Sequence, residues 1–160
     1  MKFKINGGYL LVEVMIAITI LSIGFLGILG LISSAISLNR TVSDQFIANY
    51  LSMEGIEIVK NLIDANVMQG KPWNEGFSNG DFEVNYKSVF LENNSSRRIL
   101  FDSVTGYYDY QGEKQTPFVR TINIALMGAD QIKVKSTVKW SGRGGKFETS
   151  LEDYLFNWRP

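Results

Sequence analysis

The sequence predicts an α+β protein in which one long N-terminal helix packs on a small antiparallel β-sheet. Two features of the chain lead to this expectation. Residues 9–38 are almost wholly apolar, whereas hydrophobic and polar residues alternate along several segments after Pro72. A long apolar run predicts a helix, and strict alternation predicts strands that bury one face. We expect an apolar half of the helix at 9–38, an amphipathic half at 39–68 and a globular antiparallel β domain at 69–160.

The composition of the chain limits its chemistry. The 160 residues include no histidine and no cysteine, so the commonest general base, the commonest metal ligand and every thiolate are absent. Lysine and arginine number 16, as do aspartate and glutamate, which disfavours a globally basic nucleic-acid binder. We expect no catalytic residue, no metal and no cofactor. The enzymatic alternative is a carboxylate pair such as Glu148 and Asp153.

The apolar segment Tyr9 to Leu38 is long enough to cross a membrane. As a helix it would measure about 45 Å, and the apolar core of a bilayer is about 30 Å thick. A cleavable signal peptide, with its cleavage site at 33–35, is one alternative, but the apolar region of such a peptide has only about 7–15 residues. An uncleaved signal anchor is the other, and it explains the length and the preceding Lys2 and Lys4.

Two features of this segment are not explained by a simple anchor. Glu13 carries its single charge, and the pair Gly7-Gly8 stands just before it. A carboxylate within a membrane helix is unfavourable and by default indicates a function. The alternative is a carboxylate at the membrane boundary that reaches the lipid headgroups. We expect Glu13 to have a specific partner.

Three glycines, Gly24, Gly27 and Gly30, recur at every third residue of the apolar segment. Each weakens a helix interior by about 1 kcal/mol relative to alanine. We interpret them as sites of helix flexibility, at which the segment bends or partly unwinds when it is packed into a larger array. The alternative is that small residues allow close packing of neighbouring membrane helices.

The helix is expected to continue as an amphipathic segment that covers one face of the sheet. Its apolar residues recur at three- and four-residue spacing; they are Val42, Phe46, Met53, Ile56, Val59 and Ile63. Gly70 and Pro72 are stop signals, so the helix should end between Asp64 and Gly70.

Period-two alternation predicts four strands. These are Asp81–Leu91, Pro117–Met127, Ile132–Trp140 and Lys146–Leu151. The last two form a hairpin through a turn at Ser141–Gly145. A further short strand is expected at Arg98–Phe101 or Tyr107–Gln111, and loops at Asn74–Asp81 and Leu91–Ser96.

For each of two groups of side chains in the β domain, the sequence allows a simple interpretation and a more specific functional one. The basic residues near Trp140 are Lys133, Lys135, Lys139, Arg143 and Lys146. A solvated strand face is the simple interpretation; contact with nucleic acid is compatible with the charge but unsupported by a motif. Tyr107, Tyr108 and Tyr110 are expected to form aromatic cross-strand pairs, with an adhesive or subunit surface as the alternative.

The N-terminal residues Gly8-Tyr9-Leu10-Leu11-Val12-Glu13-Val14-Met15-Ile16-Ala17 resemble the class III signal of type IV pilins and of the pseudopilins of type II secretion. The residues Leu21-Ser22-Ile23-Gly24-Phe25-Leu26-Gly27 are similar to minor pilins of the PilV type and to the I-type minor pseudopilins. Tyr9 and Leu10 depart from the family, which has phenylalanine and then threonine or serine. The resemblance implies a pilin-like fold.

The resemblance also implies how the chain is processed and assembled. A membrane-bound prepilin peptidase cuts after Gly8, releases residues 1–8 as a cytoplasmic leader peptide and methylates the new amine of Tyr9. Glu13 then pairs with the N-terminal amine of a neighbouring pilin or pseudopilin subunit. The further implied partners are an inner-membrane assembly platform and, before assembly, membrane lipid. The implied location is the inner (cytoplasmic) membrane, with the C-terminal domain outside the cytoplasm, and then the pilus or pseudopilus.

We therefore expect a minor pilin-like structural subunit and not an enzyme. Within the family, the alternatives are a type IV pilus, a secretion pseudopilus and a DNA-uptake filament. Outside it, the alternative is a membrane-anchored extracytoplasmic binding module with an uncleaved signal anchor.

Overall fold

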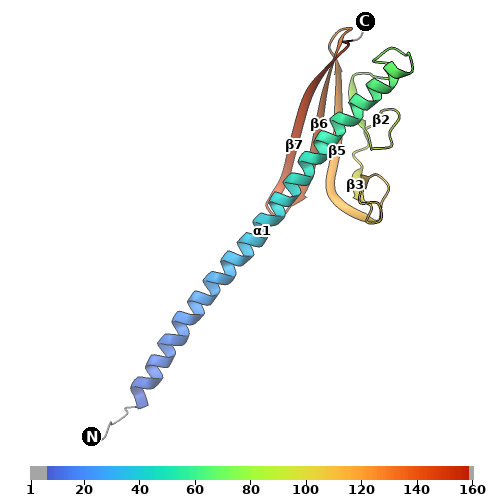
Figure 1. Cartoon of the computed structure of the whole chain (residues 1–160). Helices are drawn as coiled ribbons and strands as arrows, with labels where there is room; N and C mark the ends of the chain where they lie inside the picture. The colour runs from blue at the N-terminus through green and yellow to red at the C-terminus, as the bar shows by residue number, and fades with distance from the viewer. Residues whose placement is uncertain (1–6, 159–160) are drawn as a thin grey trace. The chain divides into compact units, whose positions relative to one another are not determined.

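The computed structural model describes residues 7–158, and the fold is α+β, with one long N-terminal helix and an antiparallel sheet (Figure 1). The chain divides into two compact units, residues 1–40 and residues 41–160. The elements are α1 (Gly7–Met68), β1 (Gly80–Glu83), β2 (Glu92–Asn93), β3 (Arg98–Phe101), β4 (Tyr108–Asp109), β5 (Lys114–Leu126), β6 (Gln131–Gly142) and β7 (Gly145–Phe156). Of the expected leader, residues 1–6 lie outside the described residues.

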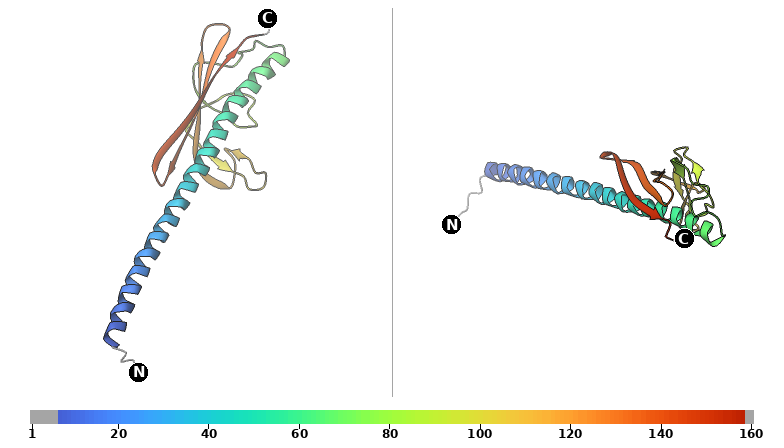
Figure 2. Two further views of the ribbon diagram at one scale, coloured as in Figure 1. Left: turned by 60° about the vertical axis from the view of Figure 1, so that its left-hand side comes forward. Right: turned by 90° about the horizontal axis from the view of Figure 1, so that it is seen from above.

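Three long strands, β5, β6 and β7, form most of the sheet in the second unit (Figure 2). One edge of β5 pairs with β6, from Val119 opposite Lys139 to Leu126 opposite Ile132. The other edge is shared by β3, at the N-terminal end of β5, and by β1, at the C-terminal end. β6 and β7 form the expected hairpin, which closes with Gly142 opposite Gly145. β7 is therefore an edge strand.

The alternation predicted for β5 and β6 is confirmed. The buried residues of β5 and β6 include Phe118, Ile122, Ile124, Ile132, Val134, Val138 and Trp140. Two of the strands are longer than expected: β5 begins at Lys114, and β7 continues to Phe156. Both candidate short strands form, as β3 and β4, and they pair with each other.

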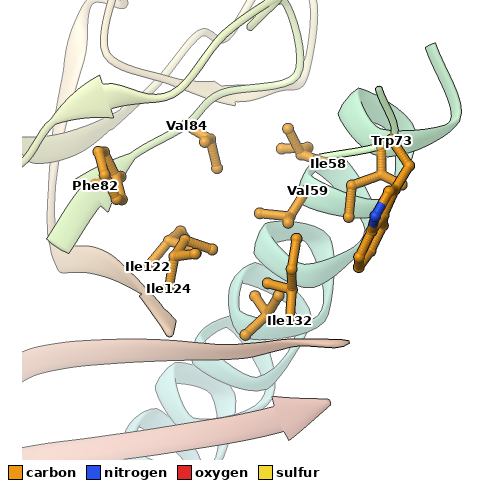
Figure 3. Packing of buried hydrophobic residues seen from close by; sticks show 10 residues of the cluster. Ile58, Val59, Trp73, Phe82, Val84, Ile122, Ile124 and Ile132 are labelled. Atoms are coloured by element: carbon orange, nitrogen blue, oxygen red, sulfur yellow. The ribbon is translucent and has the colours of Figure 1, made fainter. Parts of the chain in front are cut away.

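The C-terminal part of α1 supplies the helical side of the core, as predicted. Ile58 and Val59 on α1 pack with Ile122 and Ile132 of the sheet (Figure 3). Ile63 of α1 belongs to the same cluster. A second cluster joins Ala48 and Leu51 of α1 to other residues, namely Ile99, Phe118, Val138 and Trp140. The helix thus covers the apolar face of β5 and β6 with its own apolar residues.

Small residues allow α1 to approach the sheet closely. Ala48, Ser52 and Gly55, which we call the small-residue seam, are all buried. A Cβ atom on Gly55 would lie 2.6 Å from Ser136 Oγ and 2.7 Å from Ile122 Cδ1, closer than atoms can pack. Within the seam, Ser52 Oγ donates a hydrogen bond of 2.8 Å to the Ser136 carbonyl.

The prediction for the first part of the buried helix face is wrong. Val42, Phe46 and Met53 are exposed, and 61% of the Phe46 side chain is accessible to solvent. At 100° per residue these three positions lie on the side of α1 opposite the seam. The spacing of apolar residues led us to expect large side chains on the buried face. The close approach of the helix to the sheet instead requires small residues at the seam.

The helix ends at the predicted stop signal. Gly70 has a positive φ of 69°, and its N–H donates to the Val67 carbonyl. The next N–H, of Lys71, donates to the Asn66 carbonyl at 3.0 Å. These two bonds are a Schellman motif, in which glycine takes the left-handed conformation without a steric penalty.

The predicted strand Asp81–Leu91 is wrong beyond Glu83. Asn85 forms a local turn instead, since its side-chain oxygen accepts the Lys87 N–H and its carbonyl accepts the Ser88 N–H. Such local bonds to an asparagine side chain compete with strand pairing. The segment Leu91–Ser96, expected to be a loop, contains the short strand β2.

Arg120 is an unexpected buried residue on the apolar face of β5. Its side chain is almost fully buried and donates from Nη1 to the Leu51 carbonyl of α1 at 2.8 Å. Nη2 donates to the Val84 carbonyl at 2.6 Å, and Nη1 lies 3.4 Å from the Glu54 carboxylate. Arg120 therefore links α1, β5 and the segment that follows β1.

We predict that Gly55→Val destabilises the second unit by about 1–3 kcal/mol, because the new side chain overpacks the seam. Asn61→Val is the matched control: Asn61 is exposed on the same helix, and asparagine and valine have similar helix propensities. Unfolding of the full chain in detergent, followed by tryptophan fluorescence, measures both changes. Equal stability of the two variants would contradict the close approach at Gly55.

Candidate functional site

The residues expected to be processed and to guide assembly lie in the first turns of α1. Gly8 is the second residue of the helix, and Tyr9 and Glu13 follow. Four residues rise about 6 Å along a helix and return to the same face. Both the Tyr9 and Glu13 side chains are exposed. The structure therefore places these two expected site residues on one open face.

The apolar segment has the length and the exposure of a membrane-spanning helix. Among the described residues, α1 is the one helix long and apolar enough to cross a membrane, and its most apolar 18-residue window has a mean hydropathy of 2.6. None of that window is buried. The core helix of a soluble protein would instead be largely covered by other parts of the chain.

Glu13 differs from Thr19 and Ser22, two other polar residues of this segment. The hydroxyl of Thr19 donates to the Met15 carbonyl at 2.7 Å, and that of Ser22 donates to the Ile18 carbonyl at 2.7 Å. Such bonds satisfy a hydroxyl within its own helix. Glu13 has no hydrogen bond or ion pair with any residue in the range 7–158. A partner for the Glu13 carboxylate would therefore have to lie outside residues 7–158 or in another molecule.

The helix runs without interruption through Gly24, Gly27 and Gly30. A Cβ atom on any of the three would meet no atom within 4 Å. Packing within the described chain therefore does not require glycine at these positions. Their role in helix flexibility stays a prediction.

A second exposed surface lies on α1 in the unit that holds the sheet. Val42, Phe46, Tyr50 and Met53 recur at four-, four- and three-residue spacing and are exposed. We call this set the apolar stripe. It lies on the side of α1 away from the seam, and large exposed apolar patches commonly mark protein or membrane contacts.

The basic residues of the sheet are partly neutralised by neighbouring carboxylates. Lys133 lies 2.7 Å from Glu152, and Lys139 lies 3.8 Å from Glu148. Trp140 is only 3% exposed and its ring stacks on Phe147, so it offers no free face to a base. These contacts favour a solvated strand face over a nucleic-acid site.

Of the three tyrosines near β4, only Tyr108 forms the predicted aromatic cross-strand pair. Tyr108 lies opposite Phe101 across the strands, with ring centroids 5.1 Å apart. Tyr107 packs instead on Tyr86, with ring centroids 5.0 Å apart. Tyr110 is enclosed, and burial raises the pKa of its phenol to about 12.

The carboxylates of Glu148 and Asp153 are not brought together. They are five residues apart on β7, so they point to opposite faces of the strand and their backbones are about 16 Å apart. Glu148 is paired with Lys139 instead.

Sequence reasoning missed a buried charge network around Glu83. This side chain is 0% exposed and accepts the backbone N–H groups of Ser95 and Arg97, each at 2.9 Å. The Arg97 guanidinium binds both Glu83 and Glu92. Burial alone would raise the pKa of the Glu83 carboxyl, but the donors of Arg97 and Ser95 together hold it below its usual value. Alternation placed Glu83 on the polar face, because the partners that satisfy it are distant in sequence.

Comparisons with models of protein families, with curated proteins and with solved structures find no match.

We predict that Glu83→Gln destabilises the second unit by about 1–3 kcal/mol at neutral pH, since the buried donors lose a charged acceptor. A carboxyl with a lowered folded-state pKa stabilises the fold above its unfolded-state pKa, and this contribution disappears as the pH falls through the folded-state value. The variant should therefore lose less stability than the parent chain on acidification below pH 4.5, the unperturbed pKa.

Chemical unfolding at a series of pH values measures this difference. The control is Glu57→Gln, which removes an exposed carboxylate 3.8 Å from Lys60. An unchanged acid dependence in Glu83→Gln would show that Arg97 and Ser95 do not lower the Glu83 pKa.

Proposed function

We propose that the chain is a minor pilin-like structural subunit of a type IV pilus or a related pseudopilus, processed after Gly8 and assembled through the N-terminal part of α1. The observation that carries the proposal is the exposed carboxylate of Glu13, unpartnered among the described residues, on an exposed apolar helix. A helix that serves only as an anchor has no need of this charge, which is unfavourable in lipid.

Cleavage after Gly8 would supply the missing partner. It converts the amide nitrogen of Tyr9 into a cationic amine at the start of the helix. Within lipid, an amine and a carboxylate are each unfavourable alone and attract strongly as a pair. Because side chains tilt toward the helix N-terminus, Glu13 leans toward the turn that holds Tyr9. A neighbouring subunit displaced by about one helical turn then brings its own amine to this carboxylate.

The two surfaces of α1 would have different tasks in assembly. The apolar residues of the N-terminal segment and the apolar stripe provide area for contact between helices, but such contacts tolerate sliding. An ion pair in a low dielectric tolerates much less displacement. Glu13 therefore sets the axial register of the subunit, and the apolar residues contribute most of the contact area.

The proposal also assigns partners and a location. Before assembly the chain spans the inner membrane once, with the second unit outside the cytoplasm. A prepilin peptidase processes it there, and an inner-membrane platform transfers it to other subunits.

We predict that the mature chain begins at Tyr9. Because the peptidase removes residues 1–8, intact-mass spectrometry of the membrane-extracted protein should show this loss, with the mass of one methyl group added if Tyr9 is methylated. An intact Met1 would overturn the proposal and favour a membrane-anchored binding module. Cleavage after Ala35 would overturn it in favour of an exported soluble protein.

We predict that Glu13→Gln leaves cleavage after Gly8 unchanged but lowers incorporation into filaments by about tenfold or more. Removing one partner of a buried ion pair costs about 3–5 kcal/mol, which accounts for a change of this size. Immunoblots of membrane and sheared-filament fractions measure incorporation, and mass spectrometry measures cleavage. The control is Glu57→Gln, which removes a carboxylate on α1 whose partner is Lys60. Normal incorporation of Glu13→Gln would show that this charge does not set the register.

A further inference from the structure

A hollow of about 410 Å³ lies in the second unit, between α1 and two loops of the β domain. It is lined by Glu54 of α1, by Tyr86 and by Gly106, Tyr107 and Tyr108. We call it the tyrosine hollow. Its volume falls within the range of about 300–1,000 Å³ that is usual for small-molecule sites, and no residue of the proposed assembly mechanism takes part in it.

The aromatic rings of the hollow are accessible and yet held in place. Tyr86 is 42% exposed and Tyr107 57% exposed, and their rings pack on each other at an angle of 41°. Tyr108 is half-buried and fixed by Phe101. Rings that are ordered before binding present their faces to a ligand with little loss of side-chain freedom.

The electrostatics of the hollow favour a cation. Glu54 is half-buried, and a single oxygen of its carboxylate contacts Arg120. Burial raises the pKa of the Tyr108 phenol, and the negative charge of Asp44 raises it further. The positive charge of Lys87, which lies over the Tyr86 ring, is paired with the Asp109 carboxylate at 3.5 Å. The negative charges of Glu54 and Asp44 therefore add to the negative electrostatic potential of the ring faces.

Tyrosines of this chain already bind cations from the chain itself. Lys87 Nζ lies 4.9 Å from the centroid of the Tyr86 ring, and the Arg97 guanidinium carbon lies 4.4 Å from that of Tyr110. Both distances are within the range of about 6 Å for a cation–π contact. Tyr107 and Tyr108 have no such cation among residues 9–158, although they line the same hollow as Glu54.

We propose that the tyrosine hollow binds a quaternary ammonium group of the choline type. The Glu54 charge is partly neutralised by Arg120, so it compensates poorly for the dehydration of a primary ammonium, which is strongly hydrated. A quaternary ammonium is weakly hydrated and needs no hydrogen-bond acceptor. The faces of Tyr107 and Tyr108 then supply the attraction, Tyr86 holds the Tyr107 ring in place, and Glu54 supplies long-range charge complementarity.

Titration of the full chain with choline tests the proposal. The protein is kept in a detergent with an uncharged polyoxyethylene head group, so that the detergent contributes no ammonium group. Binding is followed by the NMR resonances of the tyrosines and by the heat released in a calorimeter. The comparison ligand is 3,3-dimethylbutan-1-ol, which has the shape of choline without its charge. We expect saturable binding of choline, and binding of the neutral alcohol and of Nα-acetyl-lysine amide that is weaker by about tenfold.

Variants locate the binding. Tyr107→Ala should weaken choline binding by about tenfold, whereas Tyr107→Phe, which keeps the ring, should change it by less than about twofold. Glu54→Gln should weaken it by about threefold to fivefold. The matched control is Tyr154→Ala, at an exposed tyrosine beside Lys133 on β7. Thermal unfolding shows whether each variant keeps the fold.

Three results of the choline titrations would overturn the proposal. They are the absence of saturable choline binding, equal affinity for choline and its neutral isostere, and an unchanged affinity of folded Tyr107→Ala. Binding of a neutral sugar in place of choline, sensitive to Tyr107→Ala, would also overturn it and would assign the hollow to carbohydrate. None of these results bears on cleavage after Gly8 or on the role of Glu13.

Discussion

The close approach of α1 to the sheet at Gly55 is the constraint on which the second unit depends. No side-chain atom fits between the helix and Ser136 or Ile122 at this point, so the seam admits only small residues. Leu51 is buried beside the seam, whereas the large apolar residues Val42, Phe46, Tyr50 and Met53 lie on the opposite side of α1 and form the apolar stripe. The small residues of the seam and the large exposed residues of the stripe therefore lie on opposite sides of one helix.

The same approach brings the polar groups of helix and sheet within bonding distance. Arg120, on the apolar face of β5, reaches the Leu51 carbonyl only because the helix backbone is so near. Arg120 also contacts the Glu54 carboxylate and the Val84 carbonyl. Glu54 lines the tyrosine hollow, and Val84 lies two residues before Tyr86, which lines it as well. A buried guanidinium gains little stability by itself. Its three contacts join the helix, the strand and the loop at one point.

The parts of the fold that follow from local pattern were predictable, and those that depend on distant partners were not. The alternation in β5 and β6 and the stop at Gly70 are local signals, and they determined the strands and the helix end. The wrong strand beyond Glu83 has the same alternation, but local bonds at Asn85 prevail over pairing. The burial of Glu83 and Arg120 was not predictable, because each is satisfied by groups far away in the sequence. For the candidate site, the sequence identified Glu13 and Tyr9, whereas the tyrosine hollow assembles residues from three separate segments.

The two proposed activities of the chain rest on different physical requirements. Pairing at Glu13 needs a helix, a low dielectric and a free amine; it makes no demand on the sheet. Binding in the tyrosine hollow needs the seam, Arg120 and the loops that carry Tyr86 and Tyr107. A substitution in those loops can change the ligand while the seam and the register charge stay intact, since neither loop contributes to the contact at Gly55. Under the two proposals, the mode of assembly and the specificity of the β domain therefore depend on separate parts of the chain.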